Sequence, residues 1–259
     1  MARKKLDMNE TLRALSQLKR VLVLHGLHPD DDNAAWRAAL LARAQGGWVR
    51  VLHVSRFRSA DSARERLAPL AWRLQEHLQV AVVAQAFRGN RDAEVRRAAE
   101  DADLVVLRAL SGLDAAAGLH PMTAARIGMR PTLVVRTPAN AAYRRLLLGV
   151  NEEPDMQLVA AAGRTVTDGV EVPAVAPLHS AASLLERERS LLPDVVAVPC
   201  SPSPALARRF LALTRADTLL LPDGRAAAVP HRAPAGAGIL LGSGMLVSPI
   251  DLPVGEELP

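Results

Sequence analysis

The chain has 259 residues, 49% of them hydrophobic, and carries a formal net charge of +5. This length exceeds one average domain, and the apolar content is typical of a globular protein with a buried core. Cys200 is the single cysteine, which excludes an intrachain disulfide and a cysteine zinc cluster. Because no apolar run approaches the roughly 20 residues of a membrane helix and the start does not resemble a signal peptide, we expect a cytoplasmic protein.

Basic residues gather at the start of the chain, and we interpret residues 1–18 as a basic leader exposed to solvent. Such an arm can also contact nucleic acid or an anionic membrane. No basic stretch elsewhere is interleaved with aromatic residues, so stacking on single-stranded nucleic acid has no support. We therefore expect neither a membrane nor a nucleic acid as partner.

Short apolar runs alternate with segments of helical periodicity in the first half of the chain. The polar loop that begins at His28 ends where Asp32 or Asn33 can cap a helix. Strands are expected over residues 20–24, 48–54, 80–87, 104–107 and 132–135, and helices over 34–45, 63–78, 92–100 and 120–127. Strands that alternate with helices predict an α/β fold with a doubly wound parallel sheet.

The same series restarts after Pro138. The run 145–150 repeats the first strand, the run 216–221 repeats residues 102–107, and Leu246-Val247 repeats Leu133-Val134. We therefore predict a pseudo-dimer of two tandem domains over residues 19–138 and 143–252. The sequence separation between matching runs of the two copies decreases along the chain. This decrease indicates that the second copy has lost about ten residues before its fourth strand, through a trimmed second helix near residues 183–192.

The sharpest short motif is His28-Pro29-Asp30-Asp31-Asp32, directly after the first strand. It resembles the His-Pro-Asp-Asp-Glu motif of zinc-dependent N-deacetylases, which implies that His28 and Asp31 hold a metal and that Asp30 is the general base. Asp32 replaces the glutamate of that motif, and Thr123 stands where a second downstream imidazole is expected. The alternative interpretation is a capping loop without metal, because aspartate is common at helix starts.

No other motif brings together residues that could carry out catalysis. Cys200 has no histidine partner in the sequence pattern, and Ser243 lacks the strand-to-helix context of a nucleophile elbow. The glycines of residues 236–244 precede a predicted strand, whereas phosphate-binding loops follow one. We therefore predict no catalytic residues and favour a protein that is not an enzyme.

The order and doubling of these elements resemble the universal stress protein family. The likeness extends over residues 19–250 and rests on the runs 20–24, 51–54, 102–107 and 132–136, and on 146–151 in the second copy. It implies a Rossmann-like fold, a non-catalytic stress-response or regulatory role in a bacterial-type protein, and pairing of the two copies through their fifth strands. A further homodimer and an unidentified protein partner are consistent with this resemblance.

Members of that family that bind ATP have an acidic residue after the first strand and a glycine-rich loop after the fourth. The acidic position falls at His25 or Gly26 in the first copy and at Asn151 in the second. Of the glycines, only Gly224 is well placed after the fourth strand of the second copy. The resemblance thus implies a degenerate site with weak or lost binding of ATP or another adenine nucleotide. The candidate ligand-binding residues are His25, Gly26, Asp30, Asn151 and Gly224.

Overall fold

The structure, a computed structural model, describes residues 18–55, 59–109, 119–150, 153–167, 174–200 and 204–222, with only the backbone for 153–158. Its strands are β1 (Arg20–Leu24), β2 (Trp48–Ser55), β3 (Ala81–Arg88), β4 (Leu104–Arg108), β5 (Thr132–Val135), β6 (Leu146–Val150), β7 (Ala174–Pro177), β8 (Val195–Pro199) and β9 (Asp217–Leu221). Its helices are α2 (Asp31–Ala44), α3 (Ala60–Leu78), α4 (Arg91–Glu100), α6 (Pro121–Gly128), α7 (Glu153–Val166), α8 (Ala181–Leu191) and α9 (Pro204–Leu213). Residues 1–17 of the predicted leader, Asn151, Gly224 and the strand expected at Leu246-Val247 lie outside the described residues.

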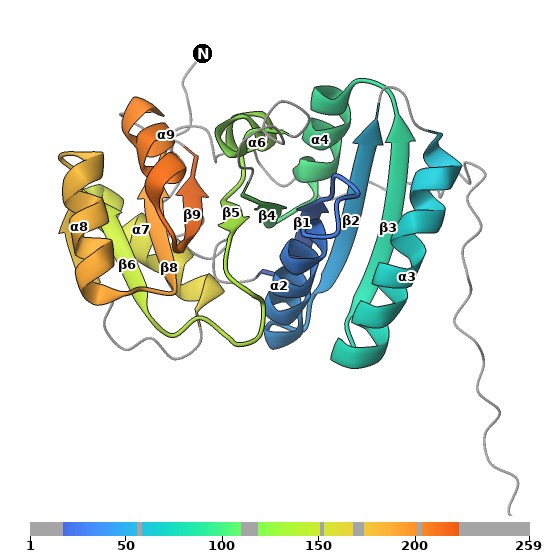
Figure 1. Ribbon diagram of the computed structural model, residues 1–259, viewed down its shortest axis with the longest axis horizontal. Coiled ribbons are helices and arrows are strands. Elements are labelled where there is room, and N and C mark those ends of the chain that lie inside the picture. Colours follow the sequence, from blue (N-terminus) through green and yellow to red (C-terminus); the bar gives the residue numbers. More distant parts are fainter. Residues whose placement is uncertain are drawn as a thin grey trace, which may run out of the picture. The chain divides into compact units, whose positions relative to one another are not determined.

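The described strands form one nine-stranded sheet in the order β3-β2-β1-β4-β5-β9-β8-β6-β7 (Figure 1). Strands β1 to β5 run parallel to one another, and so do β6 to β9. The two groups meet where β5 and β9 pair antiparallel, with Thr132 opposite Leu220 and Val134 opposite Thr218. This arrangement confirms the predicted α/β class and the doubly wound parallel sheet.

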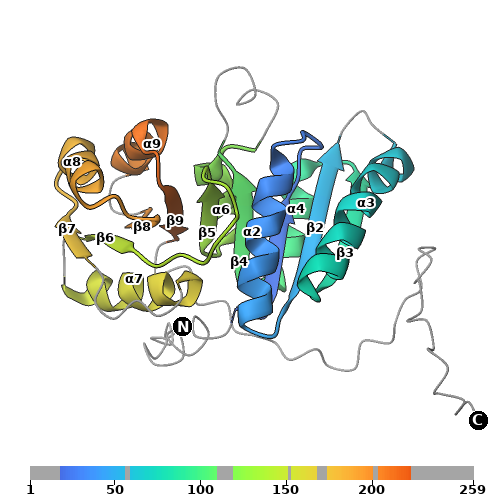
Figure 2. The same cartoon turned by 60° about the horizontal axis from the view of Figure 1, so that its bottom comes forward.

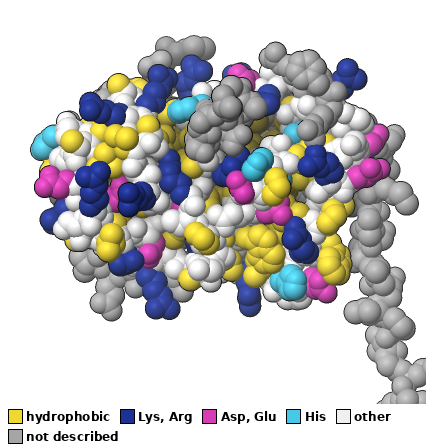
Figure 3. Space-filling view, viewed as in Figure 1, with side chains coloured by type: hydrophobic (Ala, Val, Ile, Leu, Met, Phe, Trp, Pro, Cys, Tyr) yellow, Lys and Arg dark blue, Asp and Glu magenta, His cyan; other side chains and the backbone are white. Residues whose placement is uncertain are grey.

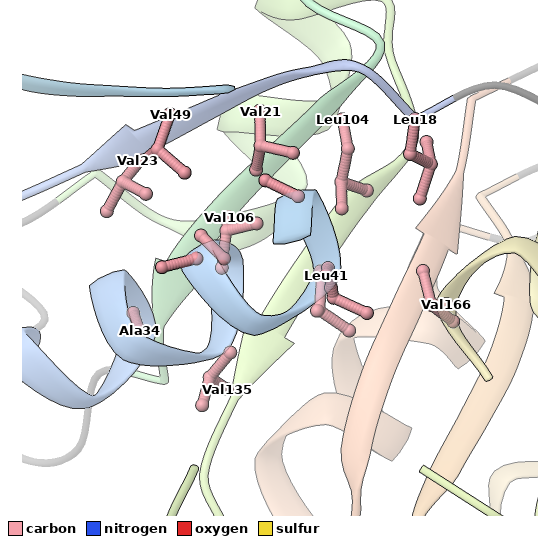
Figure 4. Packing of buried hydrophobic residues seen from close by; sticks show 14 of the residues in the cluster. Leu18, Val21, Val23, Ala34, Leu41, Val49, Leu104, Val106, Val135 and Val166 are labelled. Carbon is pink, nitrogen blue, oxygen red and sulfur yellow. The ribbon is translucent and has the colours of Figure 1, made fainter. Parts of the chain in front are cut away.

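Helices cover both faces of the sheet, with α2, α3 and α7 on one face and α4, α6, α8 and α9 on the other (Figure 2). The larger core lies under α2 and α7 and includes residues of both halves. Leu18, expected in the solvated leader, is 1% exposed and belongs to this core. Figure 4 shows its aliphatic packing, with side chains from four strands and two helices: Val21, Val23, Ala34, Leu41, Val49, Leu104, Val106, Val135 and Val166.

The ends of several helices follow local sequence signals. The Asn90 side chain accepts the amides of Asp92 and Ala93 at the start of α4, and Ser180 accepts the Ser183 amide at the start of α8. Such caps satisfy amides that have no partner inside a helix. Helix α2 is different, because it begins at Asp31 rather than at Ala34, and neither Asp32 nor Asn33 is its cap. The side chains of Asp31 and Asp32 instead bind groups outside the helix.

An arginine–aspartate pair is repeated in the two halves. One Asp103 carboxylate oxygen accepts the amides of Lys19 and Arg20 at the start of β1, and the other lies 2.8 Å from the Arg20 guanidinium. One Asp194 oxygen accepts the amides of Arg144 and Arg145 at the start of β6, at 2.8 Å each, and the other lies 3.3 Å from the Arg145 guanidinium. Arg20 and Asp103 are 83 positions apart, whereas Arg145 and Asp194 are 49 apart.

This pair corrects the predicted alignment of the second copy. Strand β8 lies beside β6 as β4 lies beside β1, so residues 195–199, and not 217–221, occupy the fourth position. Strand β9 takes the outermost position of its half, where it pairs with β5. Helix α8 packs on the face opposite α7, as α4 does opposite α2, so the helix over 181–191 is not a trimmed second helix. Between β7 and β8 the second half has the single helix α8, whereas the first half has α3, β3 and α4 between β2 and β4.

A buried polar cluster fixes the connection between β5 and β6. Asp217 is fully buried; its Oδ1 accepts the amides of Arg136 and Thr137 at 2.7 and 2.8 Å, and its Oδ2 accepts the Tyr143 hydroxyl. The guanidinium carbon of Arg37, from α2, lies 4.0 Å from the centre of the Tyr143 ring. The Asn33 side chain of α2 donates to the Thr137 carbonyl and accepts the Ala139 amide, both at 2.7 Å. Helix α2 therefore holds the connection in place.

Candidate functional site

A cavity of about 220 Å³ opens at the carboxyl ends of β1, β2 and β4. Here the chain leaves β1 toward α2 on one face of the sheet and leaves the neighbouring β4 toward α6 on the other face, and ligands of open α/β sheets bind at such switch points. Its walls combine aliphatic side chains with a few polar ones: Leu24, His25, Gly26, His28, Asp31, Leu52, His53, Val54, Arg91, Val95, Leu107, Arg108 and Leu119.

The turn after β1 is built around Asp31. Its Oδ2 accepts the amides of Gly26 and His28 at 2.8 and 3.1 Å, and its side chain is 6% exposed. A Cβ atom at Gly26 would lie 2.9 Å from this oxygen, so the close approach requires glycine. Leu27 has a φ of 67°, a strained conformation for a branched side chain that often occurs at functional sites.

Two buried imidazoles line the cavity, and their hydrogen bonds fix their tautomers. His25 Nδ1 accepts the Leu27 amide at 3.0 Å, so Nε2 carries the proton and donates to Asp32 at 3.1 Å. His53 Nδ1 lies 2.8 Å from the His25 carbonyl oxygen and must donate to it, because a carbonyl only accepts. These bonds join the carboxyl ends of β1 and β2 at the cavity wall.

Arginine side chains neutralise the carboxylates of the loop. Arg108, the last residue of β4, donates through Nε to Asp31 at 2.8 Å and through Nη1 to Asp30 at 3.1 Å. Asp32 accepts from Arg73 at 2.8 Å. The carboxylates that a zinc ion would need are thus already bound to guanidinium groups, whose positive charge competes with a cation for the same oxygens.

The metal interpretation of His28 and Asp31 therefore gains no support. His28 Nδ1 accepts the Asp30 amide at 3.3 Å, and its side chain is 48% exposed. Among the described residues, no group of three or more histidine, cysteine, aspartate or glutamate side chains has an arrangement that could hold a metal ion. The motif instead forms a tight turn in which Asp31 accepts the amides of Gly26 and His28, and no side chain of the motif caps α2.

Of the predicted ligand-binding residues, the structure brings His25 and Gly26 to the cavity wall and ties Asp30 to Arg108 beside them. His53 and Arg108 also line the cavity but were not predicted from the sequence. The signal for Arg108 was its position at the end of the predicted fourth strand, since the carboxyl ends of neighbouring parallel strands share one edge of the sheet. Asn151 and Gly224 lie outside the described residues, and their proposed roles stay predictions.

The face of the molecule shown in Figure 3 carries arginine and lysine side chains scattered among acidic and apolar ones. On the described part of that face, the basic side chains do not gather into one extended surface. Within the described residues, no helix is both long enough and apolar enough to span a membrane.

Comparison with solved structures shows the fold. The structure is similar to a universal stress protein from Archaeoglobus fulgidus DSM 4304, with 10% sequence identity, a TM-score of 0.60, and coverage of 81% of this chain and 98% of that one. It is also similar to a functionally unknown protein, PA1789, from Pseudomonas aeruginosa PAO1, with 13% identity, a TM-score of 0.56, and coverage of 83% and 96%. No protein-family model and no curated protein matches the sequence.

Proposed function

We propose that this chain is a non-catalytic regulatory protein of the universal stress protein type that binds one small ring-containing ligand in the cavity beside β1. The observation that carries the proposal is an apolar cavity at the β1–β4 crossover whose imidazoles and carboxylates are already bound to the protein. A role in the stress response and a cytoplasmic location belong to the same proposal.

The bonds within the site favour binding over proton transfer. His25 uses one ring nitrogen as an acceptor and the other as a donor, and Asp31 receives two amides and one guanidinium. A general base needs a lone pair directed at its substrate. Here these lone pairs hold the turn together, so their function is to shape the cavity.

The size and lining of the cavity indicate the class of ligand. A volume of about 220 Å³ lies below the roughly 300–1,000 Å³ of sites that enclose a drug-sized ligand, so it suits a single ring system. Leu52, Val54 and Val95 offer apolar contacts to such a ring. We propose an adenine nucleotide bound weakly through its base, because the sequence lacks the glycine spacing that holds phosphates in the family it resembles.

The proposal includes the tandem arrangement, with domains over residues 19–138 and 143–252. The repeated pairs Arg20–Asp103 and Arg145–Asp194 support it, as does the position of β6 between β7 and β8, which matches that of β1 between β2 and β4. The pairing of β5 with β9 places the two outer strands side by side. Association of two copies of the chain stays a prediction, which sedimentation of the purified protein measures.

The first test is native mass spectrometry of the freshly purified chain, followed by calorimetric titration with AMP and ATP. We expect binding in the micromolar to millimolar range and its loss in Val54→Phe, because Val54 is 7% exposed and its larger replacement fills the cavity. Val83→Phe is the matched control, since Val83 lies on β3, is 45% exposed and does not line the cavity. Equal affinity in both variants would place the ligand elsewhere and contradict the proposal.

A further inference from the structure

A second and larger cavity, of about 580 Å³, lies beside the β5–β6 connection. It is bounded by residues 137–145, by the end of α8, and by the turns that lead into β8 and β9. The charged side chains of its wall are four arginines and two carboxylates: Arg37, Arg145, Arg189, Arg215, Glu188 and Asp194.

Part of this charge is already compensated inside the protein. Arg145 pairs with Asp194 at 3.3 Å. The buried Arg37 donates to the carbonyls of Pro138 and Ala141, and its Nε lies 3.9 Å from Asp217. Glu188 Oε1 accepts the amides of residues 215 and 216 at 2.8 and 2.9 Å. These contacts form the base of the cavity and give it a fixed shape.

The remaining positive charge lies at the rim. Arg189 and Arg215 are exposed, and neither side chain makes a hydrogen bond or ion pair with any residue in the described ranges. Two guanidinium groups that border one cavity offer the planar donors that bind phosphate oxygens in pairs. Exposed arginines are common on protein surfaces, so the charge alone is not sufficient evidence for a site.

Two buried atoms provide the independent observation. Glu188 Oε2 and Arg37 Nε have no hydrogen-bond partner among the described residues, although the two side chains belong to residues only 6% and 3% exposed. Native proteins seldom leave buried polar atoms without partners, so each such atom needs an explanation, such as a water molecule or a ligand that completes the site. Both residues line this cavity. Their charges call for a ligand with a hydrogen-bond donor as well as an anionic group.

We propose that this cavity binds an organic phosphate of nucleotide size, with its phosphate groups on Arg189 and Arg215 and a donor group directed toward Glu188. The volume falls within the roughly 300–1,000 Å³ range of small-molecule sites, and free phosphate would occupy only a small part of it. The proposal does not depend on the function of the cavity beside β1.

The test is calorimetric titration of the full chain with ATP, GTP and inorganic pyrophosphate, at low ionic strength and at physiological salt. The variant Arg189→Gln/Arg215→Gln removes both rim charges, and we expect at least a tenfold loss of affinity for the nucleotides. The variant Arg187→Gln/Arg209→Gln is the matched control, because it removes the same charge from exposed positions of α8 and α9 that do not line the cavity. Pyrophosphate should bind more weakly than the nucleotides, because it carries no amino or sugar hydroxyl group to donate to Glu188.

The outcomes separate this site from the cavity beside β1. Nucleotide binding that survives Val54→Phe and is lost in the rim variant supports the second site. Binding that is unchanged in the rim variant overturns it, and so does the absence of binding of all three probes at millimolar concentration. Pyrophosphate that binds as tightly as the nucleotides also overturns the proposal, because it would indicate a simple anion site.

Discussion

Replacing Tyr143 with phenylalanine tests the buried cluster that joins the two halves. The substitution removes the hydroxyl that donates to Asp217 Oδ2 and leaves Arg37 Nε, 3.9 Å away, as the nearest charged group to that oxygen. Asp217 is fully buried and cannot recover the bond from water. A hydrogen bond to a charged group contributes about 1.5–3 kcal/mol, so we expect the free energy of unfolding to fall by about 2–3 kcal/mol.

Urea denaturation of the full chain at neutral pH measures this loss. Thr132→Val is the control, because the Thr132 hydroxyl is equally buried but donates to a neutral carbonyl, that of Arg130, at 3.1 Å. That bond should contribute about 1 kcal/mol. If Tyr143→Phe costs less than Thr132→Val, Asp217 is not a charged acceptor of the tyrosine hydroxyl and the reasoning fails.

Tyr143 should also make the stability of the protein depend on pH in the alkaline range. Burial raises the pKa of Tyr143 well above its usual value of 10.0, and the negative charge of Asp217 raises it further. Because the folded-state pKa exceeds the unfolded one, the stabilisation is complete below about pH 10 and is lost as the pH rises through the folded-state value. Tyr143 is the only tyrosine, so phenolate absorbance reports it alone and should appear together with unfolding. Ionisation near pH 10 in the folded protein would refute this assignment.

Three further substitutions test other parts of the structure. Gly26→Ala should abolish binding at the cavity beside β1 and cost about 1–3 kcal/mol, because its Cβ would lie 2.9 Å from the Asp31 carboxylate; titration and urea denaturation measure the two effects. Burial raises the pKa of Asp194, but the hydrogen bonds from the amides of residues 144 and 145 and from the Arg145 guanidinium outweigh it and lower that pKa. The resulting stabilisation is present above about pH 4 and is lost as the pH falls further, so a pH series of melting temperatures should be flatter at acid pH in Asp194→Asn. Phe210→Ala should cost about 3–5 kcal/mol in urea denaturation, because Phe210 is fully buried between α9 and the sheet; a loss below 1 kcal/mol would contradict the packing described here.

The sequence predicts the strands of the first half well because each is a continuous apolar run between polar turns. Strands β1 and β5 have the expected limits, and β2 and β4 extend one residue further. The start of α2 was missed because Asp31 turns back to the Gly26 and His28 amides, a contact that depends on the tight turn after β1. A capping rule applied to composition alone cannot identify that use of an aspartate.

The alignment of the second copy was wrong for a different reason. Both Asp194 and Asp217 precede an apolar run, and the pattern Asp103-Leu104 fits either of them. Only the pairing of strands decides, because Asp194 binds the start of β6 as Asp103 binds the start of β1. Arg108 was missed for a similar reason. Its contact with Asp31 joins residues 77 positions apart, and it can be inferred only once β4 is known to lie beside β1.

Because β5 and β9 pair antiparallel, each rim of the sheet carries the carboxyl ends of one half and the amino ends of the other. The carboxyl ends of β1 to β5 lie on the same rim as the amino ends of β6 to β9, so equivalent crossovers in the two halves open toward opposite sides. The carboxyl ends of β6 and β8 therefore lie on the rim opposite the one that carries the cavity beside β1.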